Sequence, residues 1–251
     1  MRSAAGLIAL AATAVLSGSQ PAVTPSPVPV VVELFTSEGC SSCPPADQLL
    51  SKLLNEQPVA GVQIIPLGMH VTYWDQLGWK DSGSLALATE RQQDYSRVFG
   101  GDRVYTPQLV VDGADEIVGS DESGARRAIA KAAKQPHARL SMTAAVDGRA
   151  LTAQVTIADL PAGANEPMAL KVALTESGLT SIVKRGENGG RTLHHDAVVR
   201  AIFGSDAGVA RLVTARAELR PEWRRDQMRA VAILQGKKTQ RIWGAASVAL
   251  K

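Results

Sequence analysis

One stretch near the start of the chain decides the fold of its first half: Val30-Val31-Val32-Glu33-Leu34-Phe35-Thr36-Ser37-Glu38-Gly39-Cys40-Ser41-Ser42-Cys43-Pro44-Pro45. The β-branched and aromatic run at its start predicts a buried strand. Apolar residues at helical spacing over 46–54 predict a helix directly after the second cysteine. These are the only two cysteines in 251 residues. A bond between them would close a very short loop and stabilise little, so the pair indicates chemistry rather than a scaffold.

Cys40 and Cys43 have the spacing of a thiol–disulfide exchange motif. Unpaired N–H groups and the helix dipole stabilise a thiolate near a helix N-terminus, and the thiolate is the nucleophile. Cys40 can attack a substrate disulfide, and Cys43 can then resolve the mixed disulfide. Pro44 and Pro45 suit a first helical turn. They place the start of the regular helix nearer Ser42, which leaves Cys40 at its lip.

The remainder of the first half alternates strands and helices. A second strand ends at His70, and an Asp112-Gly113 turn predicts a hairpin further on. The expected elements are strands at 62–69, 108–111 and 116–119 and helices at 84–99 and 123–134.

Beyond Gln135-Pro136 the helical signals nearly vanish, which suggests a domain boundary. Alternating or apolar runs separated by turn residues predict an all-β sandwich. The seven expected strands are 140–146, 151–157, 169–174, 193–202, 210–215, 228–234 and 240–248.

The N-terminus has the pattern of an export signal. Arg2 precedes an apolar run over 6–16, which is too short to span a bilayer, and small polar residues follow. We therefore expect a signal peptide at 1–22, a periplasmic or secreted mature protein, and no membrane span in it. The net charge of +3 and the 4% aromatic content argue against a nucleic-acid partner. For the favoured function the sequence predicts neither a cofactor nor a metal ion.

The first half resembles the thioredoxin fold in its order of strand, Cys-x-x-Cys, helix, strand, helix, Thr-Pro, strand, hairpin and helix. The resemblance implies that Pro107 is cis and lies beside the nucleophilic sulfur, with Thr106 and Tyr105 shaping the substrate cleft. The alternative is an ordinary trans proline that begins a strand. The resemblance also implies a buried acid before the cysteines. Glu33 could then accept the proton of the resolving thiol, or it could be a salt-bridged or partly exposed strand residue.

Several longer sequence segments resemble one particular secreted bacterial family, domain of unknown function 1223. This resemblance covers nearly the whole mature chain and implies a thioredoxin-like first part, but it implies no assigned activity. At position 72, where the family pattern leads us to expect Asp, this chain has Thr. The strings that carry the resemblance are 32–47, 70–81, 105–108, 186–193 and 198–200.

Four further features of the sequence are informative, and most leave alternatives open. His70 could tune Cys40, complete a copper site with the two cysteines, or cap its strand. Trp74 could anchor a loop or form a substrate platform. His194 and His195 are neighbours in a strand, so their side chains should point to opposite faces, one buried and one exposed. The tip at 187–191 serves either turn formation or partner contact.

We therefore expect an α/β plus all-β protein, with a thioredoxin-like domain at 23–136 and a β-sandwich-like domain at 137–251. The predicted function is that of an exported thiol–disulfide oxidoreductase that acts on protein thiols or disulfides. One alternative is a copper- or metal-binding periplasmic protein that uses Cys40, Cys43 and His70. Another is a non-catalytic binding module. The catalytic candidates are Cys40, Cys43 and Glu33, and the substrate-binding candidates are Thr106, Pro107, Tyr105, His70 and Trp74.

Overall fold

The computed structural model describes residues 26–206 and 212–250, so the predicted signal peptide at 1–22 lies outside the described residues. The first half forms the expected elements in the expected order. They are β1 (Val28–Thr36), α1 (Pro44–Glu56), β2 (Val62–His70), α2 (Ala86–Val98), β3 (Gln108–Val111), β4 (Asp115–Val118) and α3 (Glu122–Ala132).

The second half is built from strands and one short 3₁₀ helix. The predicted run at 193–202 is two strands separated by a turn. The short strand at 179–182, between the predicted runs at 169–174 and 193–202, is not indicated by the sequence pattern. The elements are β5 (Arg139–Asp147), β6 (Ala150–Ala158), β7 (Met168–Glu176), β8 (Leu179–Ile182), β9 (Thr192–His195), β10 (Val198–Asp206), β11 (Leu212–Glu218), η1 (Arg225–Gln227), β12 (Met228–Gly236) and β13 (Ile242–Ala249).

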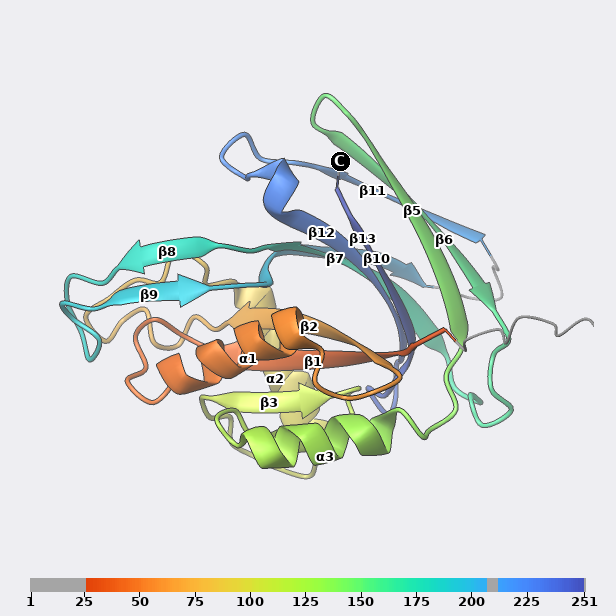
Figure 1. The fold of residues 1–251 in the computed structure, drawn as a ribbon, viewed down its shortest axis with the longest axis horizontal. Coiled ribbons are helices and arrows are strands. Elements are labelled where there is room, and N and C mark those ends of the chain that lie inside the picture. Colours follow the sequence, from red (N-terminus) through yellow and green to blue (C-terminus); the bar gives the residue numbers. More distant parts are fainter. Residues whose placement is uncertain (1–25, 207–211, 251) are drawn as a thin grey trace, which may run out of the picture.

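One mixed sheet of eight strands runs through both halves in the order β13-β12-β7-β10-β2-β1-β3-β4. β1 and β2 are parallel along their whole length, whereas β3 runs antiparallel to β1. The two halves join where β10 pairs with β2 through Val198 and Gly68. Figure 1 shows the long strands of the second half continuing the sheet beyond β2.

The expected fold class is therefore wrong. The protein is mostly β, with three α-helices in the described residues, and the first half does not stand as a separate thioredoxin-like α/β domain. The second half is not a separate sandwich either, because four of its strands belong to the large sheet. The physical reason is that β2 would otherwise be an apolar edge strand, and pairing with β10 at Gly68 covers the end of that edge.

The two faces of β1 pack against different helices. Val32 and Leu34 contact apolar side chains of α1 and α3. Val31 and Phe35 contact Ala88 and Tyr95 of α2. Because strand side chains alternate between faces, Glu33 lies on the α2 side. Both faces of this strand are thus buried, which agrees with its continuous apolar sequence.

A second sheet of three strands, in the order β11-β6-β5, packs against the strands of the second half through a shared apolar cluster. β8 and β9 form a separate two-stranded hairpin. Figure 1 shows the far end of this hairpin at the same end of the molecule as the start of α1. Within the described ranges, no helix has the length and apolar character needed to cross a membrane.

Candidate functional site: a buried disulfide at a strand-to-helix turn

Cys40 and Cys43 form a disulfide between the end of β1 and the start of α1, with their Cα atoms 5.4 Å apart. The turn is held by its own backbone, because the Cys40 N–H donates to the Ser37 carbonyl and the Cys43 N–H donates to the Cys40 carbonyl. Both cysteines are 0% exposed, whereas Ser41 and Ser42 between them are exposed. The bond is therefore covered from solvent in this state.

Helix α1 begins at Pro44, and Cys43 occupies its N-cap position. The Cys43 carbonyl accepts from the N–H groups of Ala46 and Asp47. Cys40 lies before the helix, as the two prolines predicted. The helix dipole therefore acts most directly on Cys43, and it favours a negative charge on that sulfur when the disulfide opens.

Trp74 connects the cysteine turn to the Thr-Pro segment. Its indole N–H donates to Thr106 Oγ1 at 2.8 Å. Its Cβ lies so close to Gly39 that a Cβ on Gly39 would come within 3.2 Å of it. The tryptophan thus packs beside the residue that precedes Cys40.

The Thr106–Pro107 peptide bond is cis, as the resemblance implied. Pro107 is buried beside the first turn of α1. A Cβ on Gly119 would come within 2.8 Å of Pro107 and 3.1 Å of Ala46, so these residues are in close contact. Tyr105 is 39% exposed, and its carbonyl accepts from Gln92. The structure therefore brings the cysteines, Trp74, Thr106 and Pro107 to one end of the sheet.

A cluster of buried acids and one imidazole lies beneath the cysteine turn, and we call Glu38, Asp47 and His195 the His195 cluster. The two ring nitrogens of His195 lie 3.6 Å from Glu38 Oε1 and 3.8 Å from Asp47 Oδ2. Both nitrogens are buried, and neither has a hydrogen-bond partner in the part of the chain that the structure describes. As expected for strand neighbours, His194 is exposed.

The acids of this cluster are held close to the disulfide. Asp47 follows Cys43 by one helical turn, and its Oδ1 accepts from Thr36 Oγ1 at 2.8 Å. Burial raises the pKa of Asp47. A buried carboxyl with a raised pKa beside an imidazole can accept or release a proton during a reaction. Sequence reasoning missed Asp47, although its position one turn after Cys43 was a usable signal.

His70 belongs to the same region but forms an ion pair with Asp81. Its Nδ1 lies 2.7 Å from Asp81 Oδ2, and its ring contacts that of His195 edge-on. Burial alone would lower the pKa of His70, but the Asp81 carboxylate raises it to about 9. Burial would raise the pKa of Asp81, but His70 lowers it to about 2. The pair is thus ionised at neutral pH, and Asp81 also accepts from the Glu38 N–H.

Glu33 does not reach this region. Its carboxylate accepts from Arg91 Nη2 at 2.9 Å and from the Tyr95 hydroxyl, on the α2 face of the sheet. Gln235 of β12 completes this group by accepting from Arg91 and donating to Tyr95. We call these four residues the Glu33 cluster. They place the side chain of Glu33 on the opposite face of the sheet from α1.

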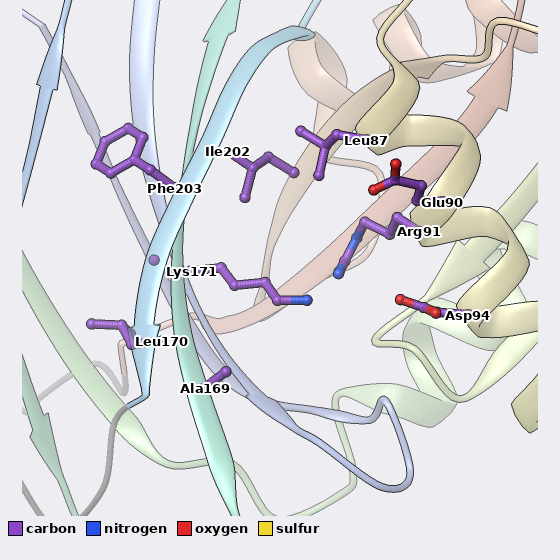
Figure 2. A pocket seen from close by; sticks show the side chains of 10 residues that line it. Leu87, Glu90, Arg91, Asp94, Ala169, Leu170, Lys171, Ile202 and Phe203 are labelled. Atoms are coloured by element: carbon purple, nitrogen blue, oxygen red, sulfur yellow. The ribbon is translucent and has the colours of Figure 1, made fainter.

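A pocket of about 400 Å³ adjoins the Glu33 cluster on the α2 face. Figure 2 shows the amine of Lys171 and the guanidinium of Arg91 extending into it, with Glu90 and Asp94 on α2. Burial and the charge of Arg91 lower the pKa of Lys171 to about 8. None of the residues of the cysteine turn lines this pocket.

The tip of the β8–β9 hairpin lies over the cysteine turn. The Asn188 side chain is fully buried, and its Nδ2 donates to the carbonyls of Glu38 and Cys40, each at 2.9 Å. Glu187 Oε2 accepts from the Ser41 N–H at 2.9 Å. The sequence predicts a hairpin tip here but does not distinguish turn formation from partner contact. No local pattern could show that it contacts residues almost 150 positions away.

Metal binding has no geometric support in this state. Within residues 26–206 and 212–250, no group of three or more His, Cys, Asp or Glu side chains is arranged to hold a metal ion. The two sulfur atoms are bonded to each other, and His70 is paired with Asp81.

Fold and site together define a protein with a mixed β-sheet that carries a buried Cys-x-x-Cys disulfide at a strand-to-helix turn. Residues 31–235 match a protein family described as "Protein of unknown function (DUF1223)", and the chain belongs to this family. No curated protein matches the sequence.

Two solved structures are similar over most of the chain. The crystal structure of protein AGR_C_4864 from Agrobacterium tumefaciens is 26% identical, with a TM-score of 0.64 over 90% of this chain and 96% of that one. HBP35 of Porphyromonas gingivalis is 14% identical, with a TM-score of 0.63 over 90% of this chain and 76% of that one. The second likeness concerns the fold alone.

Proposed function

We propose that the protein is an exported thiol–disulfide oxidoreductase that exchanges Cys40–Cys43 with thiols or disulfides of other proteins. One observation carries the proposal: the disulfide closes four residues between a strand and a helix N-terminus, next to buried acids and an imidazole that has no hydrogen bond to any described residue. Such a short loop stabilises a chain by only about 2 kcal/mol. Backbone and side-chain hydrogen bonds already hold the turn, so a structural role is a poor explanation for the bond.

The proposed half-reaction conserves electrons. A thiolate of a partner dithiol attacks Sγ of Cys40, a mixed disulfide forms, and the Cys40–Cys43 bond breaks. Cys43 leaves as a thiolate at the N-terminus of α1 and takes up a proton. The second partner thiolate then attacks the partner sulfur of the mixed disulfide and releases Cys40. The partner is oxidised to a disulfide while the Cys pair gains two electrons, and the reverse reaction follows the same steps.

The surroundings supply the other groups. Asp47 and His195 lie beside the start of α1, where a proton must arrive when Cys43 leaves. Trp74, Thr106 and Pro107 form one wall beside the turn, and exposed Tyr105 adjoins it. Glu33 is paired elsewhere, so we assign the proton-handling role to the His195 cluster instead.

The proposed location is the periplasm or the exterior of the cell. The export signal predicted at 1–22 supports this location, and so does the formed disulfide, because disulfides persist in oxidising compartments.

Trapping tests the proposed function. A Cys43→Ala variant retains the attacking sulfur of Cys40 but cannot resolve a mixed disulfide. Expressed with its export signal, it should accumulate covalent complexes with other proteins, which mass spectrometry can identify after non-reducing electrophoresis. Cys40→Ala is the matched control and should trap far less. Equal recovery from both variants, or none from either, would contradict the proposal.

A further inference from the structure

The hairpin whose tip contacts the cysteine turn comes from the opposite half of the sequence. Its tip spans residues 183–191, between β8 and β9. The tip contacts the cysteine turn through the carboxylate of Glu187 and the amide of Asn188. It also lies against the loop after β2, since a Cβ on Gly186 would come within 3.3 Å of the Trp79 side chain. The backbone of the cysteine turn is therefore held by a segment that is not part of that turn.

This tip is attached mainly by polar contacts. Of its nine residues only Val183 and Asn188 are buried, and the others are exposed. Gly186 and Gly190 have φ values of +79° and +84°, so the tip's backbone adopts conformations that suit glycine. A segment with few buried apolar contacts and exposed hydrogen bonds opens locally at low free energy. The apolar clusters of the sheet would remain intact in such an opening.

Opening would change which groups of the cysteine turn are paired. The carbonyls of Glu38 and Cys40 would lose the amide of Asn188, and the Ser41 N–H would lose the carboxylate of Glu187. Unpaired carbonyl and N–H groups along one short stretch match the backbone pattern of an extended polypeptide. The same opening would remove the tip from the turn that carries the 0% exposed disulfide.

We propose that the 183–191 tip is a latch over the Cys40–Cys43 disulfide, and that an extended, cysteine-containing segment of a partner protein replaces it. This inference rests on the proposed function for its partner, but the latch itself concerns only access to the bond. Asn188 is a positioning residue. It holds the backbone of Cys40 in the closed state and touches no reacting atom.

The rate of disulfide reduction by a water-soluble phosphine tests the latch without any protein partner. The phosphine attacks one sulfur and the S–S bond breaks. Water then completes the reaction, leaving two thiols and one phosphine oxide. Asn188→Asp keeps the size of the side chain but replaces the N–H donors that face two carbonyls. It should be reduced at least about tenfold faster than the parent protein, because losing hydrogen bonds favours the open state.

Two further variants keep the test decisive. Glu187→Gln changes an exposed side chain and should not affect folding, yet it removes the charge that pairs with the Ser41 N–H. It should raise the reduction rate about threefold and speed hydrogen exchange at the Ser41 amide. Lys184→Ala, at an exposed position of the same tip, is the matched control and should leave both readouts unchanged.

If Asn188→Asp and Glu187→Gln were both reduced at the same rate as the parent protein, the latch proposal would be wrong. If Asn188→Asp fails to fold, Glu187→Gln alone decides by the same criterion. Failure of the proposed function has a different signature, because Cys43→Ala would then trap no partner while the latch variants still showed faster reduction.

Discussion

Two buried polar clusters flank strand β1, and they differ in how completely their groups are paired. In the Glu33 cluster the carboxylate receives hydrogen bonds from Arg91 and Tyr95, and Gln235 bridges these two residues. In the His195 cluster both imidazole nitrogens are buried at 3.6 and 3.8 Å from Glu38 and Asp47, and neither forms a hydrogen bond with a described residue. The first cluster ties α2 to β12, and the second lies beneath the disulfide.

The contrast separates groups that stabilise the fold from groups that can act. Satisfied buried networks fix the packing of the elements they join. Buried polar groups without partners are rare, and they concentrate where chemistry requires them. We therefore assign a structural role to Glu33 and a proton-handling role to the cluster around His195. Three predictions test this difference, ordered by their expected effect on the free energy of unfolding.

The largest loss should follow from Arg91→Met. This change leaves the Glu33 carboxylate buried at 0% exposure without its cation, which typically costs about 3–5 kcal/mol. Urea unfolding measures the loss, and Arg97→Met, at an exposed arginine of the same helix, should change stability by less than about 0.5 kcal/mol. A loss below about 1 kcal/mol for Arg91→Met would show that the Glu33 cluster does not stabilise the junction between α2 and β12.

The free energy of unfolding should depend on pH through the ion pair between His70 and Asp81. The folded pKa of His70 is about 9, above its ordinary value of 6.5, so its contribution is complete below about pH 6.5 and is lost as pH rises toward 9. That loss is on the order of 3 kcal/mol. Asp81 titrates at about 2, below 3.8, so at the acid end the contribution is present above about pH 4 and is lost as pH falls toward 2.

His70→Gln isolates this pair from the other titrating groups. Unfolding free energies of the variant and the parent protein, measured between pH 6 and 9.5, should converge as pH rises. Parallel curves across that range would contradict an ion pair between His70 and Asp81.

The smallest change in stability should come from His195→Leu. Among the described residues the imidazole has no hydrogen-bond partner, so its replacement removes only its two long contacts with Glu38 and Asp47, and stability should stay within about 1 kcal/mol of the parent value. The rate of exchange with a dithiol at pH 7 should nevertheless fall at least about tenfold, because the proton for Cys43 loses its relay. Stopped-flow fluorescence can follow the exchange. An unchanged rate would remove His195 from the mechanism.

Much of the local structure could be predicted from the sequence. Strand β1, the turn at Cys40 and Cys43, helix α1 and the hairpin at Asp112-Gly113 follow from residue periodicity and turn chemistry. The opposite environments of His194 and His195 follow from strand alternation. These features depend on neighbours in the chain, and that is why the pattern of residues reveals them.

The remainder depends on contacts between distant segments. Nothing in the sequence of β2 or β10 shows that they pair, and they meet through a single register pair, Val198 and Gly68. The face on which Glu33 lies was equally hidden, because β1 is apolar on both sides. Asn188 reaches the carbonyl of Cys40 across 148 positions, and no spacing rule connects them.

The central claim is that Cys40–Cys43 is an exchange disulfide rather than a structural bond, and its reduction potential tests this most directly. The purified protein is equilibrated with thiol–disulfide redox buffers, quenched and alkylated. This gives the oxidised fraction of the protein at each buffer potential. The proposal predicts a potential between about −270 and −120 mV, the range of proteins that exchange disulfides. A potential below about −300 mV, where structural disulfides lie, would contradict it.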